Sequence, residues 1–250
     1  MSDKSTIEWT DATWNPVTGC SKVSPGCAHC YAEKLSLRFG RSLLPWTPAN
    51  AEENVVLHPE RLEVPLSWRQ PRMVFVNSMS DMWHPLVPAE YIDQVFEVMQ
   101  RAARHTYQIL TKRPELMRAW FDGPGAKWAA DPLPNVWLGC SIENDRWVGR
   151  ADELRATPAA VRFISAEPLL GPQPSLDLTD IDWLIVGGES GSSHRPMNEA
   201  WVRALKAKAD EAGTAFFFKQ WGGRTPKAGG RDLDGRTWDA FPEGATTAGS

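Results

Sequence analysis

Short apolar runs alternate along the chain with longer segments whose apolar residues recur every three to four positions. The clearest run is 72–77, Arg-Met-Val-Phe-Val-Asn, a near-continuous apolar stretch of strand length. Such runs are typical of parallel sheets that are covered on both faces. The segment 88–104 follows, with Tyr91 and Val95 among the apolar residues of one helical face. The pattern therefore predicts a buried strand followed by an amphipathic helix.

The same alternation continues through the chain. Further strands are predicted at 6–10, 54–57, 107–110, 135–139, 161–164, 183–186 and 215–218. Further helices are predicted at 31–39, 59–68 with a break at Pro65, 114–121, 145–156 and 198–212. In the first helix Leu35 and Phe39 are four positions apart and Gly40 is expected to end it, and Asn198 and Gly213 are expected to cap the last helix. This alternation predicts an α/β fold with a parallel (β/α) barrel or partial barrel, similar to a TIM barrel.

Length and composition favour one large domain in a reducing cytoplasm. We expect a single barrel domain over 1–221, and a Gly-rich, polar tail over 222–250 that is extended on the body or partly disordered. The net charge of −4 excludes a strongly basic coat for nucleic acid, although a local basic groove remains open. No apolar run is long enough to span a bilayer and no signal peptide is visible, so no membrane partner is expected.

Three of the four cysteines, Cys20, Cys27 and Cys30, lie within eleven residues between the first predicted strand and helix. Four cysteines in a chain of this length do not indicate a disulfide framework. Thiolates gathered on one loop favour a soft metal centre, and Pro25-Gly26 lets the loop fold back on itself. We therefore predict these three as metal ligands with one coordination position open. Cys140 is interpreted as a small core residue.

The residues alone do not decide between iron and zinc. A zinc site would need a fourth ligand, for which His29, His84 and His194 are candidates. His29 lies between two cysteine ligands and is expected to point away from the metal. We expect His58 and His105 to make local packing contacts only.

Polar residues follow nearly every predicted strand, and in an α/β barrel these carboxyl ends form the active face. The candidates for a binding site are Lys112, Arg113, Ser141, Glu143, Ser165, Glu167, Gly187, Gly188 and Glu189. Each of them alone is most simply a loop or capping residue, and the hypothesis of a site depends on their recurrence at strand after strand. The stretch 187–191, Gly-Gly-Glu-Ser-Gly, suits either an anion cradle or a plain turn.

Several motifs resemble those of an uncharacterised phage-associated three-cysteine family, which in turn resembles the radical S-adenosylmethionine superfamily. They are 13–20 (Thr-Trp-Asn-Pro-Val-Thr-Gly-Cys), 25–27, 30–32, 77–81 (Asn-Ser-Met-Ser-Asp), 110–114 (Leu-Thr-Lys-Arg-Pro), 138–141, 165–169 (Ser-Ala-Glu-Pro-Leu), 187–191, 218–222 (Phe-Lys-Gln-Trp-Gly), 233–236 and Trp238. Together they cover almost the whole chain. The first gap between cysteines is six residues, whereas the wider superfamily usually has three.

The resemblance implies that Cys20, Cys27 and Cys30 ligate three irons of a [4Fe–4S] cluster, with S-adenosylmethionine at the fourth. It implies an electron donor and a nucleic acid or nucleotide as substrate, in DNA modification or repair. By their position, the candidates to hold the methionyl and ribose groups of S-adenosylmethionine are Ser141, Glu143, Ser165 and Glu167. Those for its adenine or ribose are Gly187, Gly188 and Glu189, and those for a carboxylate are Lys112 and Arg113. The alternatives are a non-catalytic zinc or iron–sulfur protein with a protein partner, and a metal-free hydrolase that uses the glutamates.

Overall fold

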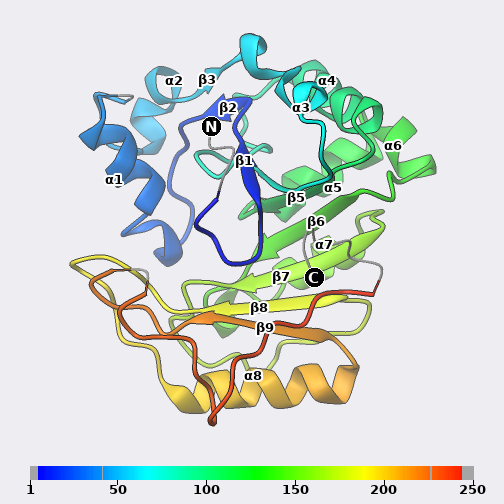
Figure 1. Ribbon diagram of the computed structural model, residues 1–250. Helices are drawn as coiled ribbons and strands as arrows, with labels where there is room; N and C mark the ends of the chain where they lie inside the picture. The colour runs from blue at the N-terminus through cyan, green and yellow to red at the C-terminus, as the bar shows by residue number, and fades with distance from the viewer. Residues whose placement is uncertain (1–4, 41, 226, 244–250) are drawn as a thin grey trace.

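Seven parallel strands form one curled sheet in the order β1-β4-β5-β6-β7-β8-β9. The computed structural model describes residues 5–40, 42–225 and 227–243. The strands are β1 (Ala12–Trp14), β4 (Met73–Val76), β5 (Thr106–Thr111), β6 (Val136–Ser141), β7 (Val161–Ala166), β8 (Trp183–Gly187) and β9 (Ala215–Gln220). The sheet curls into half of a barrel (Figure 1). The prediction of an α/β partial barrel in a single domain is therefore confirmed.

Helices cover the convex face of the sheet. They include α4 (Ala89–Arg101), α5 (Pro114–Asp122), α6 (Ala126–Ala130), α7 (Arg150–Arg155) and α8 (Glu199–Ala212). The N-terminal part adds α1 (Tyr31–Arg38), α2 (Ala51–Asn54), α3 (Val64–Ser67) and a separate antiparallel pair, β2 (Val17–Thr18) with β3 (Val56–Leu57). In Figure 1 the arrowheads of β8 and β9 point toward the side where α1 lies, so the carboxyl ends of these strands and α1 share one side.

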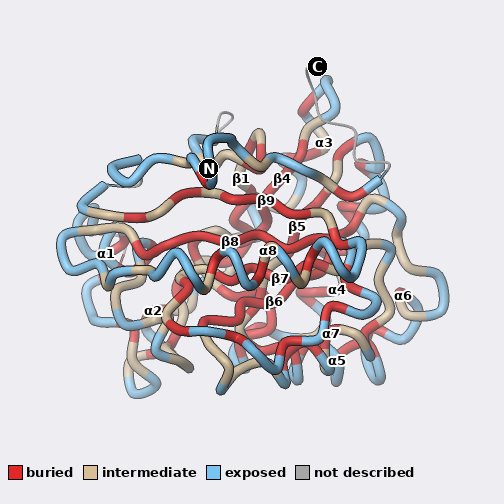
Figure 2. Tube along the Cα trace, turned by 90° about the horizontal axis from the view of Figure 1, so that it is seen from below, coloured by how far each residue is buried: buried red, intermediate tan, exposed pale blue. Residues whose placement is uncertain are grey.

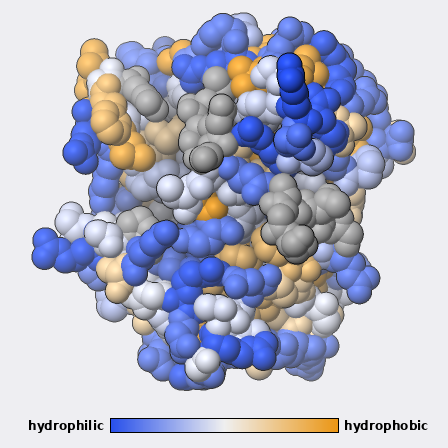
Figure 3. Space-filling model, viewed as in Figure 1, coloured by the Kyte–Doolittle hydropathy of each residue, from blue (hydrophilic) through white to orange (hydrophobic). Residues whose placement is uncertain are grey.

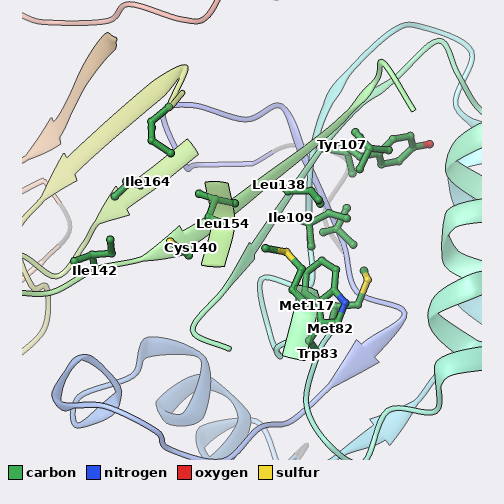
Figure 4. Close-up of a cluster of buried hydrophobic side chains, with 14 of the residues drawn as sticks. Met82, Trp83, Tyr107, Ile109, Met117, Leu138, Cys140, Ile142, Leu154 and Ile164 are labelled. Atoms are coloured by element: carbon green, nitrogen blue, oxygen red, sulfur yellow. The ribbon is translucent and has the colours of Figure 1, made fainter. Parts of the chain in front are cut away.

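The larger hydrophobic core lies between the sheet and these helices. Strand residues such as Ile109 and Leu138 meet Met117 of α5 and Leu154 of α7 there (Figure 4). Strands β4, β6 and β8 are buried along their whole length, as Figure 2 shows for the sheet in general. Burial on both faces explains why these strands read as near-continuous apolar runs in the sequence. Cys140 belongs to this core, as predicted.

A second core fills the concave face near the amino ends of the strands. We call it the floor: Trp9, Met73, Phe75, Trp137, Phe163, Trp183, Ile185 and Phe217. Trp183 lies at its centre, with its ring centroid between 5.7 and 6.1 Å from the rings of Trp9, Trp137, Phe163 and Phe217. The floor therefore closes the amino end of the half-barrel with aromatic side chains.

The first strand and the first helix differ from the predictions. Residues 6–10 form turns, and the strand begins at Ala12, because the Asp11 carboxylate accepts the backbone N–H of Met73 and aligns the two chains. Helix α1 ends at Arg38, one residue before the predicted end, and both Leu35 and the following Phe39 are exposed. Helix α1 instead turns Glu33 inward, where its carboxylate binds Lys22 and the backbone N–H of Trp46.

Two other predicted helices are shorter than expected. The segment 59–68 divides into a 3₁₀ turn, Pro59–Arg61, and α3, and 145–156 divides into a 3₁₀ turn, Asp145–Trp147, and α7. The last helix matches its prediction: the Asn198 side chain accepts the N–H of Ala200, and Gly213 ends it in the left-handed conformation. No helix among the described residues is long and apolar enough to cross a membrane.

The chain after β9 stays on the body of the protein through residue 243. The backbone N–H of Phe218 donates to Trp238 O at 2.8 Å, and that of Ala240 donates to Phe216 O at 3.2 Å. The indole N–H of Trp183 in the floor also donates to Ala240 O, at 2.9 Å. This segment therefore covers the outer edge of β9 and helps to fix the central aromatic side chain of the floor.

Candidate functional site: a three-cysteine loop at the carboxyl edge of the sheet

The cysteine loop leaves β2 at Gly19 and is attached at once to the carboxyl edge of the sheet. The N–H of Gly19 donates to Met79 O at 2.9 Å, in the loop after β4. Gly19 has φ +83°, and a Cβ there would overlap the backbone of Asn54. Only glycine allows this path without strain. Cys20 therefore enters the site from a fixed point.

The three predicted ligands lie near one another as free thiols. Cys20, Cys27 and Cys30 are each half-buried and none is in a disulfide. Cys20 and Cys30 pack against the same small cluster, which contains Trp46 and Met79. Burial raises the pKa of Cys20 to about 12, and the charge of Cys27 adds to this rise. The pKa of Cys30 is also raised, by burial first and with a contribution from Cys27.

The donor set suits a thiolate-bound group in its chemistry, although it does not surround a single point. In the part of the chain that the structure describes, no three His, Cys, Asp or Glu side chains are close enough to hold one metal ion. The cysteines of a [4Fe–4S] cluster bind different irons, whereas the ligands of zinc share one ion. The three cysteines are thus of the ligand type that both an iron–sulfur cluster and zinc use, and as the structure places them they do not surround one ion.

Arg113 connects the first cysteine to the sheet. Its side chain is buried, and its Nη1 donates to the Asp81 carboxylate at 3.0 Å and to Cys20 Sγ at 3.5 Å. Its Nη2 donates to Ser21 O at 2.8 Å. Asp81 in turn accepts the hydroxyl of Thr111 at 2.7 Å. Arg113 is therefore occupied by the cysteine loop, while the neighbouring Lys112 remains available to a ligand.

Glu143 fastens the middle of the loop from the end of β6. Its fully buried carboxylate accepts Arg150 Nη1 at 3.0 Å and the hydroxyl of Ser24. Gly26 lies against the same carboxylate, and a Cβ at that position would overlap it. A glycine is therefore required where the loop crosses this side chain. The structure therefore places Glu143 under the cysteine loop, where its carboxylate binds side chains of the protein itself.

Glu189 fastens the far side of the loop from the end of β8. It accepts Arg195 Nη2 at 2.6 Å and lies 3.0 Å from His29 Nδ1, and Arg195 also donates to Pro25 O at 3.0 Å. Burial alone would raise the pKa of Glu189, but the hydrogen bonds from Arg195 and His29 hold it at about 2. Glu189 is therefore a carboxylate that binds the loop from Pro25 to His29.

Above the floor, the concave face changes from aromatic to small and polar side chains. Side chains alternate along a strand, so Ser165 faces the same way as Phe163 two residues earlier, and Ser141 is the register partner of Ser165. Both serines are at most 2% exposed, and neither hydroxyl makes a hydrogen bond within the described residues. Two unpaired hydroxyls on the inner face are available to a ligand.

Charged groups border these serines. By the same alternation, Glu167 and Lys219 face inward from β7 and β9, and they form an ion pair at 2.6 Å. The Tyr31 hydroxyl donates to Ser78 O at 2.7 Å, and its pKa is raised by burial first and then by the nearby charges of Cys30 and Glu167. Lys112 is half-buried near Cys30 and makes no ion pair with any described residue. The inner face thus combines an unpaired cation with hydroxyl and carboxylate groups.

The glycine-rich stretch 187–191 serves the contact with the following loop. Gly188 N–H donates to Gln220 O at 2.9 Å and Gly191 N–H to Gly223 O at 2.8 Å. A Cβ on Gly188 would overlap the backbone of Trp221, and one on Gly187 would meet the Glu167 side chain at 3.1 Å. Two of these amides are therefore already bonded. Of this stretch, Gly187 is the residue whose backbone borders the inner face.

The candidate histidines all have other partners. His29 pairs with Glu189, and His84 Nε2 lies 2.8 Å from the hydroxyl of Ser21, beside Cys20. His194 Nδ1 lies 3.0 Å from Gly191 O on the exposed side of that loop. As expected, His58 and His105 make local contacts, with Thr18 and the carbonyl of Pro65.

Sequence reasoning missed the residues that hold the loop in place. Arg150 and Arg195 bind their glutamates from seven and six positions further along the chain, and both lie in segments without a motif. Asp81 is likewise the anion that orients Arg113. The available signal was the excess of carboxylates after the strands, since each buried one requires a cation.

The comparisons with known proteins identify one family. No curated protein and no solved structure gives a significant match to the chain. A family model described as a protein of unknown function (DUF5131) matches residues 4–242. That match includes the cysteine loop, all seven strands of the half-barrel and the segment that covers β9. The chain therefore belongs to this uncharacterised family.

Proposed function

We propose that this protein is an iron–sulfur enzyme of the radical S-adenosylmethionine type, with Cys20, Cys27 and Cys30 as the ligands of a [4Fe–4S] cluster. The observation that carries the proposal is the position of the three free thiols. They lie on one loop at the carboxyl edge of a partial α/β barrel, beside unpaired polar groups on its inner face. That edge is where α/β barrels place their active sites.

The chemistry that the bound group supplies is one-electron reduction at the sulfonium of S-adenosylmethionine. The chain's own residues hold and orient the cysteine loop. Glu143 and Glu189 keep the loop closed against the sheet, and Arg113 donates a hydrogen bond to Cys20. The buried carboxylates are thus positioning residues, because their contacts are to the loop.

The remaining candidates form the binding surface for S-adenosylmethionine. Lys112 suits its carboxylate, because this ammonium is unpaired and lies near Cys30. Ser141 and Ser165 offer hydroxyls for the ribose or methionyl groups, and Glu167 offers a carboxylate oxygen for the amino group. Gly187 borders the same face beside Glu167, and its backbone and that of Gly188 are the groups proposed to contact the adenine or ribose.

The resemblance to a phage-associated family favours a nucleic acid or nucleotide as the substrate, in DNA modification or repair. Such an enzyme needs an electron donor, and it works in a reducing cytoplasm, where cysteines remain as thiols. All the groups proposed to bind the cluster and S-adenosylmethionine lie on this chain, so a partner is needed only to supply the electron.

Anaerobic reconstitution tests the proposal directly. We expect about four irons and four sulfides per chain, because three cysteines and one ligand complete a [4Fe–4S] cluster. Adding S-adenosylmethionine should change the electron paramagnetic resonance spectrum of the reduced cluster. The matched control is Cys140→Ala, which removes a buried thiol from the opposite face of the sheet and should keep its iron. Cys27→Ala should lose it.

Two results would contradict the proposal. One zinc and no iron per chain would indicate a structural metal protein instead, especially if Cys27→Ala unfolds. Full iron content with a spectrum unchanged by S-adenosylmethionine would show an iron–sulfur protein of another kind.

A further inference from the structure

Near the carboxyl edge of the sheet, several cations make no ion pair within the described residues. Five carboxylates near this edge each have a cation of their own: Glu33 with Lys22, Asp81 with Arg113, Glu143 with Arg150, Glu167 with Lys219, and Glu189 with Arg195. Lys34, Lys112, Arg224 and Lys227 make no ion pair within the described residues. These cations are available to a partner even though the chain as a whole carries a net charge of −4.

Three of these cations lie on one small surface, which we call the rim patch: Lys34, Arg224 and Lys227. Lys34 Nζ is 3.4 Å from the position that a Cβ on Gly191 would occupy, so α1 reaches the loop after β8. That loop is joined to the segment after β9 by two bonds, from Gly191 N–H to Gly223 O at 2.8 Å and from Gly223 N–H to Glu189 O at 3.0 Å. Arg224 and Lys227 follow directly and are exposed. Figure 3 shows a hydrophilic surface over these loops.

An exposed aromatic ring lies beside the rim patch. Tyr31 is 50% exposed and precedes Lys34 by three positions in α1, so the two side chains are neighbours on one helical face. The bond from its hydroxyl to Ser78 O holds the ring in place. Tyr31 also follows Cys30 directly, so this surface leads to the cysteine loop.

We propose that the rim patch and Tyr31 bind a single-stranded nucleic acid, with the phosphates on the three cations and a base stacked on the ring. Cations spread over α1 and the loop after β9 match the repeated charges of a polymer, whereas one small phosphate needs donors that converge on it. A flat, exposed ring accepts a base of any identity. This inference rests on the proposed function, and it names single-stranded nucleic acid as the substrate of the same site.

The test is the binding of a fluorescein-labelled oligodeoxythymidine of about 15 nucleotides, measured by anisotropy at several salt concentrations. Each phosphate contact on a single strand contributes about 0.7 to the slope of log K against log salt. Replacing the three cations in Lys34→Ala/Arg224→Ala/Lys227→Ala should lower the slope by about 2 and weaken binding at low salt at least tenfold. Tyr31→Ala should weaken binding about tenfold and leave the slope unchanged.

The matched control is Arg69→Ala. Arg69 is exposed and without an ion pair among the described residues, but it precedes β4 and so lies at the amino edge of the sheet. Its replacement should leave both affinity and slope close to those of the wild type. Each single substitution in the rim patch should lower the slope by about 0.7, which keeps the test valid if the triple variant folds poorly.

Two outcomes would overturn the inference. An unchanged slope in the triple variant would place the phosphates elsewhere, and competition by polyglutamate as strong as that by unlabelled oligonucleotide would show an acidic-protein surface. The assay is run on the full chain both as purified and after iron reconstitution. If the oligonucleotide binds but reconstitution yields no iron in the protein, this inference is retained and the proposed chemistry is contradicted. If the protein takes up iron but does not bind the oligonucleotide, the proposed chemistry is retained and this inference is contradicted.

Discussion

The two ends of the half-barrel are built from the same strands and the same inward-facing positions, yet they differ completely in character. At the amino end, the rings of Phe163 and Phe217 pack against Trp183 in the floor. Nearer the carboxyl ends of the same strands, the inward positions are Ser165, Gly187 and Lys219. One end therefore supplies stability and the other offers polar groups to a ligand, so substitutions at the two ends should have separable effects.

The largest effect on stability is expected at the centre of the floor. Trp183→Ala removes a side chain that is fully buried among five aromatic neighbours. We expect the free energy of unfolding to fall by about 3–5 kcal/mol, because the cavity cannot fill. Urea denaturation measures this. Trp183→Phe should lose less, and a loss below about 1 kcal/mol for the alanine variant would mean that the floor is not the stabilising end.

A substitution at the carboxyl end of the half-barrel should affect the uptake of iron more than the folding of the protein. In Gly26→Ala the new Cβ overlaps Glu143, which Arg150 holds in place. We expect iron content after reconstitution to fall by at least half, with a loss of about 1–3 kcal/mol in unfolding free energy. Gly149→Ala is the control, since nothing lies within 4 Å of its Cβ position. Full iron content in Gly26→Ala would contradict the role of this contact.

Acid should weaken the carboxyl end through Glu189. Its pKa is held at about 2, below the ordinary 4.5. A carboxylate with a lowered pKa in the folded state stabilises the protein above pH 4.5, and this contribution is lost as the pH falls toward 2. Over that range, the unfolding free energy of the wild type should fall by about 1–3 kcal/mol more than that of Glu189→Gln. If the unfolding free energies of the two proteins change in parallel with pH, the stabilising role of the Glu189 carboxylate is contradicted.

The smallest effect on stability is expected for an unpaired hydroxyl. Ser165→Ala should change the unfolding free energy by less than about 0.5 kcal/mol, because the hydroxyl has no partner among the described residues. Affinity for S-adenosylmethionine should fall about two- to tenfold from the lost hydrogen bond. Thr157→Ala is the contrast: its buried hydroxyl donates to Glu153 O at 2.8 Å, so stability should fall while affinity stays. Unchanged affinity in Ser165→Ala would remove this serine from the site.

The sequence predicted those elements whose pattern of apolar and polar residues follows directly from which of their faces are buried. Strand β4 is apolar throughout because helices cover one face and the floor the other. Strand β1 has only three residues, and the side chain of Asp11 sets its start through a bond to β4. Helix α1 was predicted at its observed place, but the burial of Glu33 was not predicted, because it depends on Lys22 and Trp46. Such long-range contacts leave no periodic signal.

The site follows the same division. The cysteine loop was identifiable from residue type and spacing, since three thiols so close together are rare without a shared purpose. The functions of Glu143 and Glu189 were not identifiable, because they depend on Arg150 and Arg195. A carboxylate at a strand end looks the same in sequence whether it faces a ligand or holds a loop. Only the three-dimensional partner distinguishes the two.

The segment that runs beside β9 has a practical consequence for shortened versions of the chain. Its backbone satisfies the outer hydrogen-bonding groups of the last strand, at Phe216 and Phe218. A version ending at Gln220 would leave those groups bare along an aromatic strand, and an uncovered strand of this kind readily pairs with another copy. Self-association of such a version would therefore result from the exposed edge of β9 and would not indicate the oligomeric state of the full chain.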